Sequence, residues 1–104
     1  MENTRLETLK SLVAQNPTDS FVRYGLAMEY RKAGELEAAM REFHQLIDTN
    51  PDYSAAYFHG GQTLERLGRM DEAREIYLAG IDATNRKGDW HTRDEIQAAL
   101  DLLG

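Results

Sequence analysis

A period of 34 residues runs along the chain and constrains its fold more than any other feature. Residues of matching type or size recur at this spacing: Asn16 and Asn50, Pro17 and Pro51, Gly34 and Gly68, Ala39 and Ala73, Phe43 and Tyr77, and Ile47 and Ile81. A fixed period of this length is typical of small units stacked side by side, because each unit is too small to bury its own apolar face.

Each unit has the sequence pattern of two helices joined by a turn. Val22, Leu26 and Tyr30 have helical spacing in the first half of the first unit, and the second halves have similar apolar stripes. Gly34 and Gly68 then stand where a helix ends on a residue of positive φ. No segment alternates apolar and polar residues, so the sequence predicts an all-α protein.

We predict one domain over residues 1–104, with repeats at 18–51 and 52–85. Residues 3–15 match the second half of a unit because Asn16 and Pro17 follow them. A polar break at 85–89 precedes a final helix at 91–103. These flanking helices would cap the two ends of the stack, where a polar outer face is needed.

Polar residues lie where the helices are expected to begin, and they predict which side chains cap these helices. Thr18 or Asp19 is expected to cap the first unit, and Asp52 the second. Thr92 and Glu95 have the spacing of a capping box that opens the last helix.

Composition and charge narrow the function classes. The 104 residues include no cysteine, which excludes disulfides and thiolate chemistry. Twelve basic and eighteen acidic residues give a net charge of -6, which opposes binding to nucleic acid. No apolar run is long enough to span a membrane and no secretory signal is seen, so we expect a cytoplasmic protein.

Catalytic and metal-binding motifs are not seen. His44, His59 and His91 fall on different expected helices with no metal-ligand spacing. Gly60 and Gly61 follow His59 without the lysine and hydroxyl residue of a phosphate-binding loop. The sequence therefore predicts no enzyme, no catalytic residue, no metal and no cofactor.

The repeated positions resemble the tetratricopeptide repeat (TPR) family, whose period is 34 residues. The matching residues are Leu26, Ala27, Tyr30, Gly34, Ala39, Phe43 and Pro51 in the first unit, and Tyr57, Gly61, Leu64, Gly68, Ala73 and Tyr77 in the second. The resemblance implies a right-handed α-α superhelix whose first helices line a concave groove.

By this resemblance the chain is a protein–protein interaction module, an adaptor or scaffold that binds a peptide or partner helix in the groove. The implied partner-binding residues are Phe21, Tyr24, Met28, Arg31, Lys32, Phe58, His59, Gln62 and Arg66. Two alternatives remain. The C-terminal helix could bury these side chains, or the end helices could mediate self-association, which leaves a monomer or a weak homodimer.

Several positions depart from the family pattern. Arg23 stands where a large aromatic residue is usual. Gly60 stands where a leucine is expected, and the resulting Gly60-Gly61 pair inside an expected helix could either loosen this helix or admit a bulky neighbour such as Trp90. Tyr24 and Met28 stand at positions where some members use polar residues to bind a C-terminal carboxylate. We therefore expect no such carboxylate clamp.

Overall fold

Six α-helices form the protein in the computed structural model, which describes residues 3–104. They are α1 (Thr4–Gln15), α2 (Ser20–Lys32), α3 (Leu36–Thr49), α4 (Ser54–Arg66), α5 (Met70–Lys87) and α6 (Trp90–Leu103). No strand occurs between residues 3 and 104. The predicted all-α repeat fold is confirmed.

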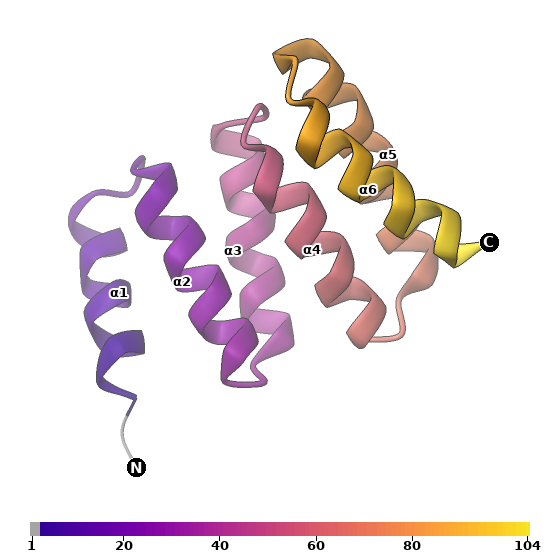
Figure 1. The fold of residues 1–104 in the computed structure, drawn as a ribbon. Coiled ribbons are helices and arrows are strands. Elements are labelled where there is room, and N and C mark those ends of the chain that lie inside the picture. The colour runs from indigo at the N-terminus through magenta and orange to yellow at the C-terminus, as the bar shows by residue number, and fades with distance from the viewer. Residues whose placement is uncertain (1–2) are drawn as a thin grey trace.

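The helices stack in chain order, so that α1 and α6 lie at opposite ends of the stack (Figure 1). Each helix packs against its neighbours in the chain, and α4 also packs against α6. The first helices α2, α4 and α6 form one layer, with α3 and α5 behind them (Figure 1). No helix within residues 3–104 has both the length and the apolar character needed to cross a lipid bilayer.

In each unit the first helix is followed by the predicted glycine, which lies in the turn to the second helix. Gly34 and Gly68 have φ values of 82° and 76°, a region that residues with a side chain adopt at a cost. The N–H of the next residue donates to the carbonyl oxygen of Tyr30 in the first turn and of Leu64 in the second, both at 2.9 Å. The 34-residue period thus reproduces the same helix termination twice.

The two units begin differently. Asp19 caps α2, since its Oδ1 accepts a hydrogen bond from the Val22 N–H at 3.1 Å. The prediction that Asp52 caps the second unit was wrong, because α4 starts after Tyr53 with no side-chain cap. Asp52 instead pairs with Arg86 on α5, at 3.0 Å.

The junction between α5 and α6 also differs from the prediction. No proline interrupts α5 at Asn85, so the helix continues to Lys87 and ends at Gly88, whose φ is 75°. Asp89 then caps α6 by accepting from the Thr92 N–H at 3.2 Å. The predicted capping box at Thr92 was wrong, because Thr92 already lies inside the helix.

A core along the stack joins all the units. Phe43, Leu46, Leu64, Tyr77 and Ile96 are fully buried. Ala39 and Ala73 are also inaccessible to solvent, as expected for small residues that let neighbouring helices approach closely. α1 differs from the other helices because it contains no buried residue.

The glycine pair in α4 admits side chains from the second helices. A Cβ added to Gly61 would lie 2.0 Å from Cε1 of Tyr77, and one added to Gly60 would lie 3.1 Å from Cδ1 of Ile76. The suggestion that Trp90 fills this space was wrong, since Trp90 is 59% exposed. The close approach of Tyr77 to the α4 backbone therefore explains why position 61 is a glycine, although glycine is a weak helix former.

The unusual Arg23 has a partner of its own. Its Nη1 lies 2.6 Å from Oε1 of Glu42 on α3, and Nη2 donates to the Pro17 carbonyl at 3.0 Å. The two charged side chains are only 12% and 19% exposed. A largely desolvated ion pair between α2 and α3 therefore replaces the aromatic contact that is usual in the family.

Candidate functional site

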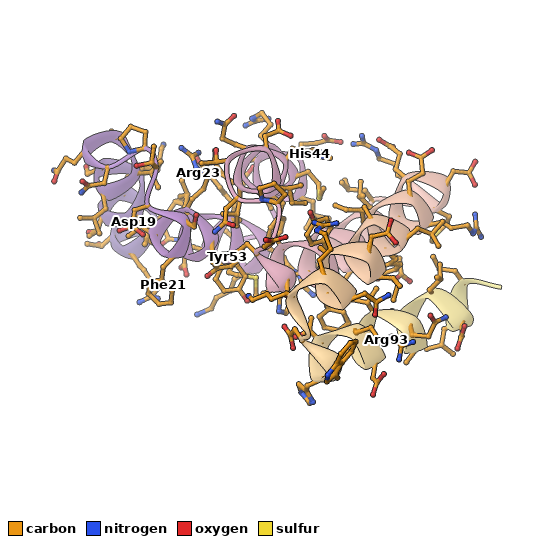
Figure 2. The ribbon with its side chains drawn as sticks, turned by 90° about the horizontal axis from the view of Figure 1, so that it is seen from above. Asp19, Phe21, Arg23, His44, Tyr53 and Arg93 are labelled. Carbon is orange, nitrogen blue, oxygen red and sulfur yellow. The ribbon has the colours of Figure 1, made fainter. Side chains whose placement is uncertain are left out.

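The predicted partner-binding residues all lie on the layer of first helices. Phe21 and Tyr53 point to the same side of this layer, whereas Arg23 points the opposite way, toward α3, which bears His44 (Figure 2). One side of α2 is therefore used for packing against α3, and the other side faces away from it.

A polar network links α2 to α4 on this side. Arg31 of α2 donates through Nη1 to Nδ1 of His59 at 2.9 Å and through Nη2 to Oε1 of Gln62 at 3.1 Å. These three predicted residues are partly buried. The structure brings them together, and the contacts hold the guanidinium of Arg31 in one orientation.

The hydrogen bond from Arg31 determines the protonation of His59. A guanidinium only donates, so Nδ1 must be the unprotonated nitrogen and Nε2 carries the hydrogen. Burial, and then the positive charge of Arg31, lower the pKa of His59 below its ordinary value. The imidazole is thus neutral at pH 7 and has one N–H group left to donate.

Aromatic rings surround this network. Tyr24 lies with its ring centroid 5.5 Å from that of Tyr53 and 5.9 Å from that of His59. Phe58 lies 5.2 Å from His59 in an edge-on arrangement. Tyr53 was not predicted for the site, because it precedes α4 and its equivalent one period earlier is Asp19.

A groove with a volume of about 690 Å³ lies between α1 and α2. Four predicted residues line it, together with α1 residues that were not predicted for the site. We call it the edge groove, and its main lining residues are Leu9, Leu12, Phe21, Tyr24, Gly25, Met28 and Lys32.

The C-terminal helix forms a second, smaller depression with α4. Its volume is about 300 Å³, and its lining is Phe58, Gln62, Glu95, Ala98, Ala99 and Leu102. Phe58 is half-buried and lines this depression together with residues of α6. Tyr24 is flanked instead by Tyr53 and His59.

The remaining basic residues are at the rim. Lys32 and Arg66 are exposed and lie in the last turns of α2 and α4. Burial, and then the like charge of Arg66, lower the pKa of Arg31, which indicates a partly desolvated guanidinium. No group of three His, Asp or Glu side chains in residues 3–104 is placed to hold a metal ion.

Comparison with known proteins identifies the family. Residues 24–86 match the tetratricopeptide repeat profile, which is more than half of the chain. The chain belongs to the tetratricopeptide repeat family. This family is generally a non-catalytic protein-interaction fold, so the chain is a protein–protein interaction module.

Several known proteins are similar to this chain over most of their length. A TPR repeat-containing protein of Pseudomonas aeruginosa is 26% identical over 94% of this chain and 93% of its own. The crystal structure of a TPR domain protein from Salinibacter ruber is 36% identical, with a TM-score of 0.77 over 82% of this chain and 94% of that one. PcrH, solved in complex with the chaperone binding region of PopD, has a TM-score of 0.88 at 15% identity, over 94% of this chain and 74% of its own.

Proposed function

We propose that this TPR protein is an adaptor that binds a peptide or helix of a partner protein on the α2/α4 face, which we define by Tyr24, Arg31, Phe58, His59 and Gln62. Phe21 and Met28 would extend the apolar contact on α2, and Lys32 and Arg66 would attract acidic residues at the rim. The like-folded PcrH, which has been solved with a segment of PopD, supports a partner of this general kind.

The observation that carries the proposal is the oriented guanidinium of Arg31. Only two of its five N–H groups have partners among residues 3–104, and its burial makes a further hydrogen bond to a carboxylate favourable. The rings of Tyr24 and Phe58, which both lie beside His59, offer apolar contact area at a low entropic cost. The face therefore suits a segment with an Asp or Glu beside large apolar residues.

The test is affinity capture from a lysate of the native organism with the intact chain and with Arg31→Met. Arg41→Met is the matched control, because it removes the same charge from an exposed position on α3. The partner should be captured by the unmodified chain and by Arg41→Met, and lost with Arg31→Met.

A titration with the purified partner then gives the size of the effect. Loss of charge-assisted hydrogen bonds should weaken binding about tenfold or more. Equal affinity of Arg31→Met and the unmodified chain would overturn the proposal.

A further inference from the structure

The edge groove is a consequence of how the repeat units pack. The second helices α3 and α5 each pack between two first helices, α3 between α2 and α4, and α5 between α4 and α6. α1 matches a second helix in sequence, yet among residues 3–104 its main contact is with α2 alone. The packing rule of the repeat therefore leaves room beside α1 and α2 for one more helix.

The walls of the groove are apolar. Phe21 is 76% exposed and Leu12 is 37% exposed, and both line the groove together with half-buried Leu9 and Met28. Apolar side chains gathered in a groove, unlike single exposed ones, indicate a binding surface.

The shape of the groove favours large side chains over close helix contact. Arg5 stands 34 residues before Ala39, at the position where a small residue lets helices approach. Its Nε is 3.2 Å from Oε2 of Glu29, so a long side chain lies across the end of the groove. Gly25 leaves the floor open, and an incoming helix would therefore reach it with large apolar side chains.

The charge of this end of the molecule indicates the kind of partner. Residues 3–32 carry five basic and three acidic residues, whereas residues 33–104 carry seven basic and fourteen acidic ones. The net charges are +2 and -7. Lys32 lines the groove and forms no ion pair within residues 3–104. Acidic partners are thus attracted to this end and repelled by the rest of the chain.

We propose that the edge groove is an adjoining binding site, which shares Phe21, Tyr24, Met28 and Lys32 with the surface of the proposed function. It takes an amphipathic helix of a partner protein with large apolar residues on one face and acidic residues beside them. A second copy of this chain is a poorer occupant. Two copies joined by this face would bring like charges together, and α6, the other end helix, turns Ile96, Leu100 and Leu103 toward its own core.

The test uses a synthetic amphipathic peptide of about 13 residues, the length of α2 and α4. It has leucines at positions i, i+3, i+4 and i+7 and glutamates beside them, and a matched peptide has lysines in place of the glutamates. Methyl NMR of the methionines reports the site, because Met28 lines the groove, Met40 is in the core and Met70 is exposed on α5.

We expect the glutamate peptide to shift the Met28 signal and to leave Met40, Met70 and the fluorescence of Trp90 on α6 unchanged. The lysine peptide should bind roughly fivefold more weakly, the effect of a few exposed charge pairs. Equal affinities of the two peptides would refute the acidic partner, and shifts spread over Met28 and Met70 would refute the site.

Gly25→Leu tests the groove without removing a contact. A Cβ at position 25 meets only Cδ2 of Leu9, at 3.4 Å, and Gly25 lines the groove, so a leucine at this position would extend into it. This variant should bind the glutamate peptide at least tenfold more weakly, whereas Gly25→Ala, with the same gain in helix propensity, should bind within about twofold. Equal binding by Gly25→Leu would overturn the proposal.

The proposed function and the proposal for the edge groove can be tested separately. Arg31 does not line the edge groove, so Arg31→Met should lose capture on the α2/α4 face and leave binding of the glutamate peptide unchanged. Sedimentation without peptide tests whether a second copy of this chain occupies the groove. If the chain forms a dimer and Gly25→Leu dissociates it, the occupant is a second copy and not a partner helix.

Discussion

The ring of Tyr77 occupies the space beside Gly61 where any other residue would place its Cβ, only 2.0 Å from Cε1. Tyr77 is fully buried and its hydroxyl donates to Glu65 of α4, so the ring is fixed from both ends. The contact between α4 and α5 therefore requires a glycine in the middle of a helix.

We expect Gly61→Ala to destabilise the protein although alanine is the better helix former. Overpacking against a fixed ring should outweigh a gain of about 1 kcal/mol in helix propensity and lower the free energy of unfolding by about 2 kcal/mol. Gly25→Ala is the control and should raise it, because position 25 meets only ordinary contact. Urea unfolding followed by circular dichroism measures both, and an equal gain for the two variants would contradict the tight contact.

The ion pair between Arg23 and Glu42 should show strong coupling in a double-mutant cycle. Either Arg23→Met or Glu42→Leu leaves one charge in a largely desolvated site, so each should cost about 2 kcal/mol. The double variant should lose clearly less than the sum of the single losses. Additive losses in urea unfolding would mean that the pair contributes little as a pair.

Asp89 should contribute more to the stability of α6 than Thr92 does through its side chain. Asp89→Ala removes the acceptor of the Thr92 N–H and should cost about 1 kcal/mol, whereas Thr92→Ala keeps this bond and should cost less. Urea midpoints of the two variants decide the order. The reverse order would restore the capping box with Thr92 as the cap.

Stability should fall when the medium becomes mildly acidic, in part through His59. Its pKa is lowered in the folded protein, so the unfolded chain takes up the proton first as the pH falls below about 6.5. The free energy of unfolding should then decrease until the folded-state pKa is passed and stay level below it. Because the side chain is partly exposed, we expect a change on the order of a few tenths of a kcal/mol.

His59→Gln provides the comparison for this pH effect, since it keeps a polar side chain that does not titrate. The difference between the unmodified chain and this variant, measured by urea unfolding at pH 7.5 and pH 5.5, isolates His59 from the other histidines. A difference that is the same at both pH values would show that His59 does not contribute.

The repeat made the fold predictable, and the contacts between helices did not follow from it. Gly34, Gly68 and Asp19 act within a few residues of chain, so their roles could be inferred from local sequence. The entry of Tyr77 beside Gly61 and the pairing of Arg23 with Glu42 depend on how two helices lie against each other. No spacing within one segment encodes these contacts.

The positions of the predicted site residues on α2 and α4 followed from the family pattern, and their contacts with one another did not. The family pattern indicates which side of α2 and α4 faces away from the second helices, and the predicted residues lie there. It does not indicate that Arg31 donates to His59 and Gln62, that Tyr53 packs against Tyr24, or that Phe21 and Met28 face a groove with α1. The first two groupings depend on how α2 and α4 lie beside each other, and the third depends on α1, where the repeat pattern stops.

The helix α1 has no buried residue and packs mainly on α2, which makes it the least anchored part of the fold. Its backbone amides should exchange with solvent through local opening that leaves α3 to α5 closed. The edge groove therefore exists only while α1 is packed on α2, so binding in the groove is coupled to the local folding of α1. A bound helix would first become visible as slowed hydrogen exchange in α1, well before the stability of the whole chain changed.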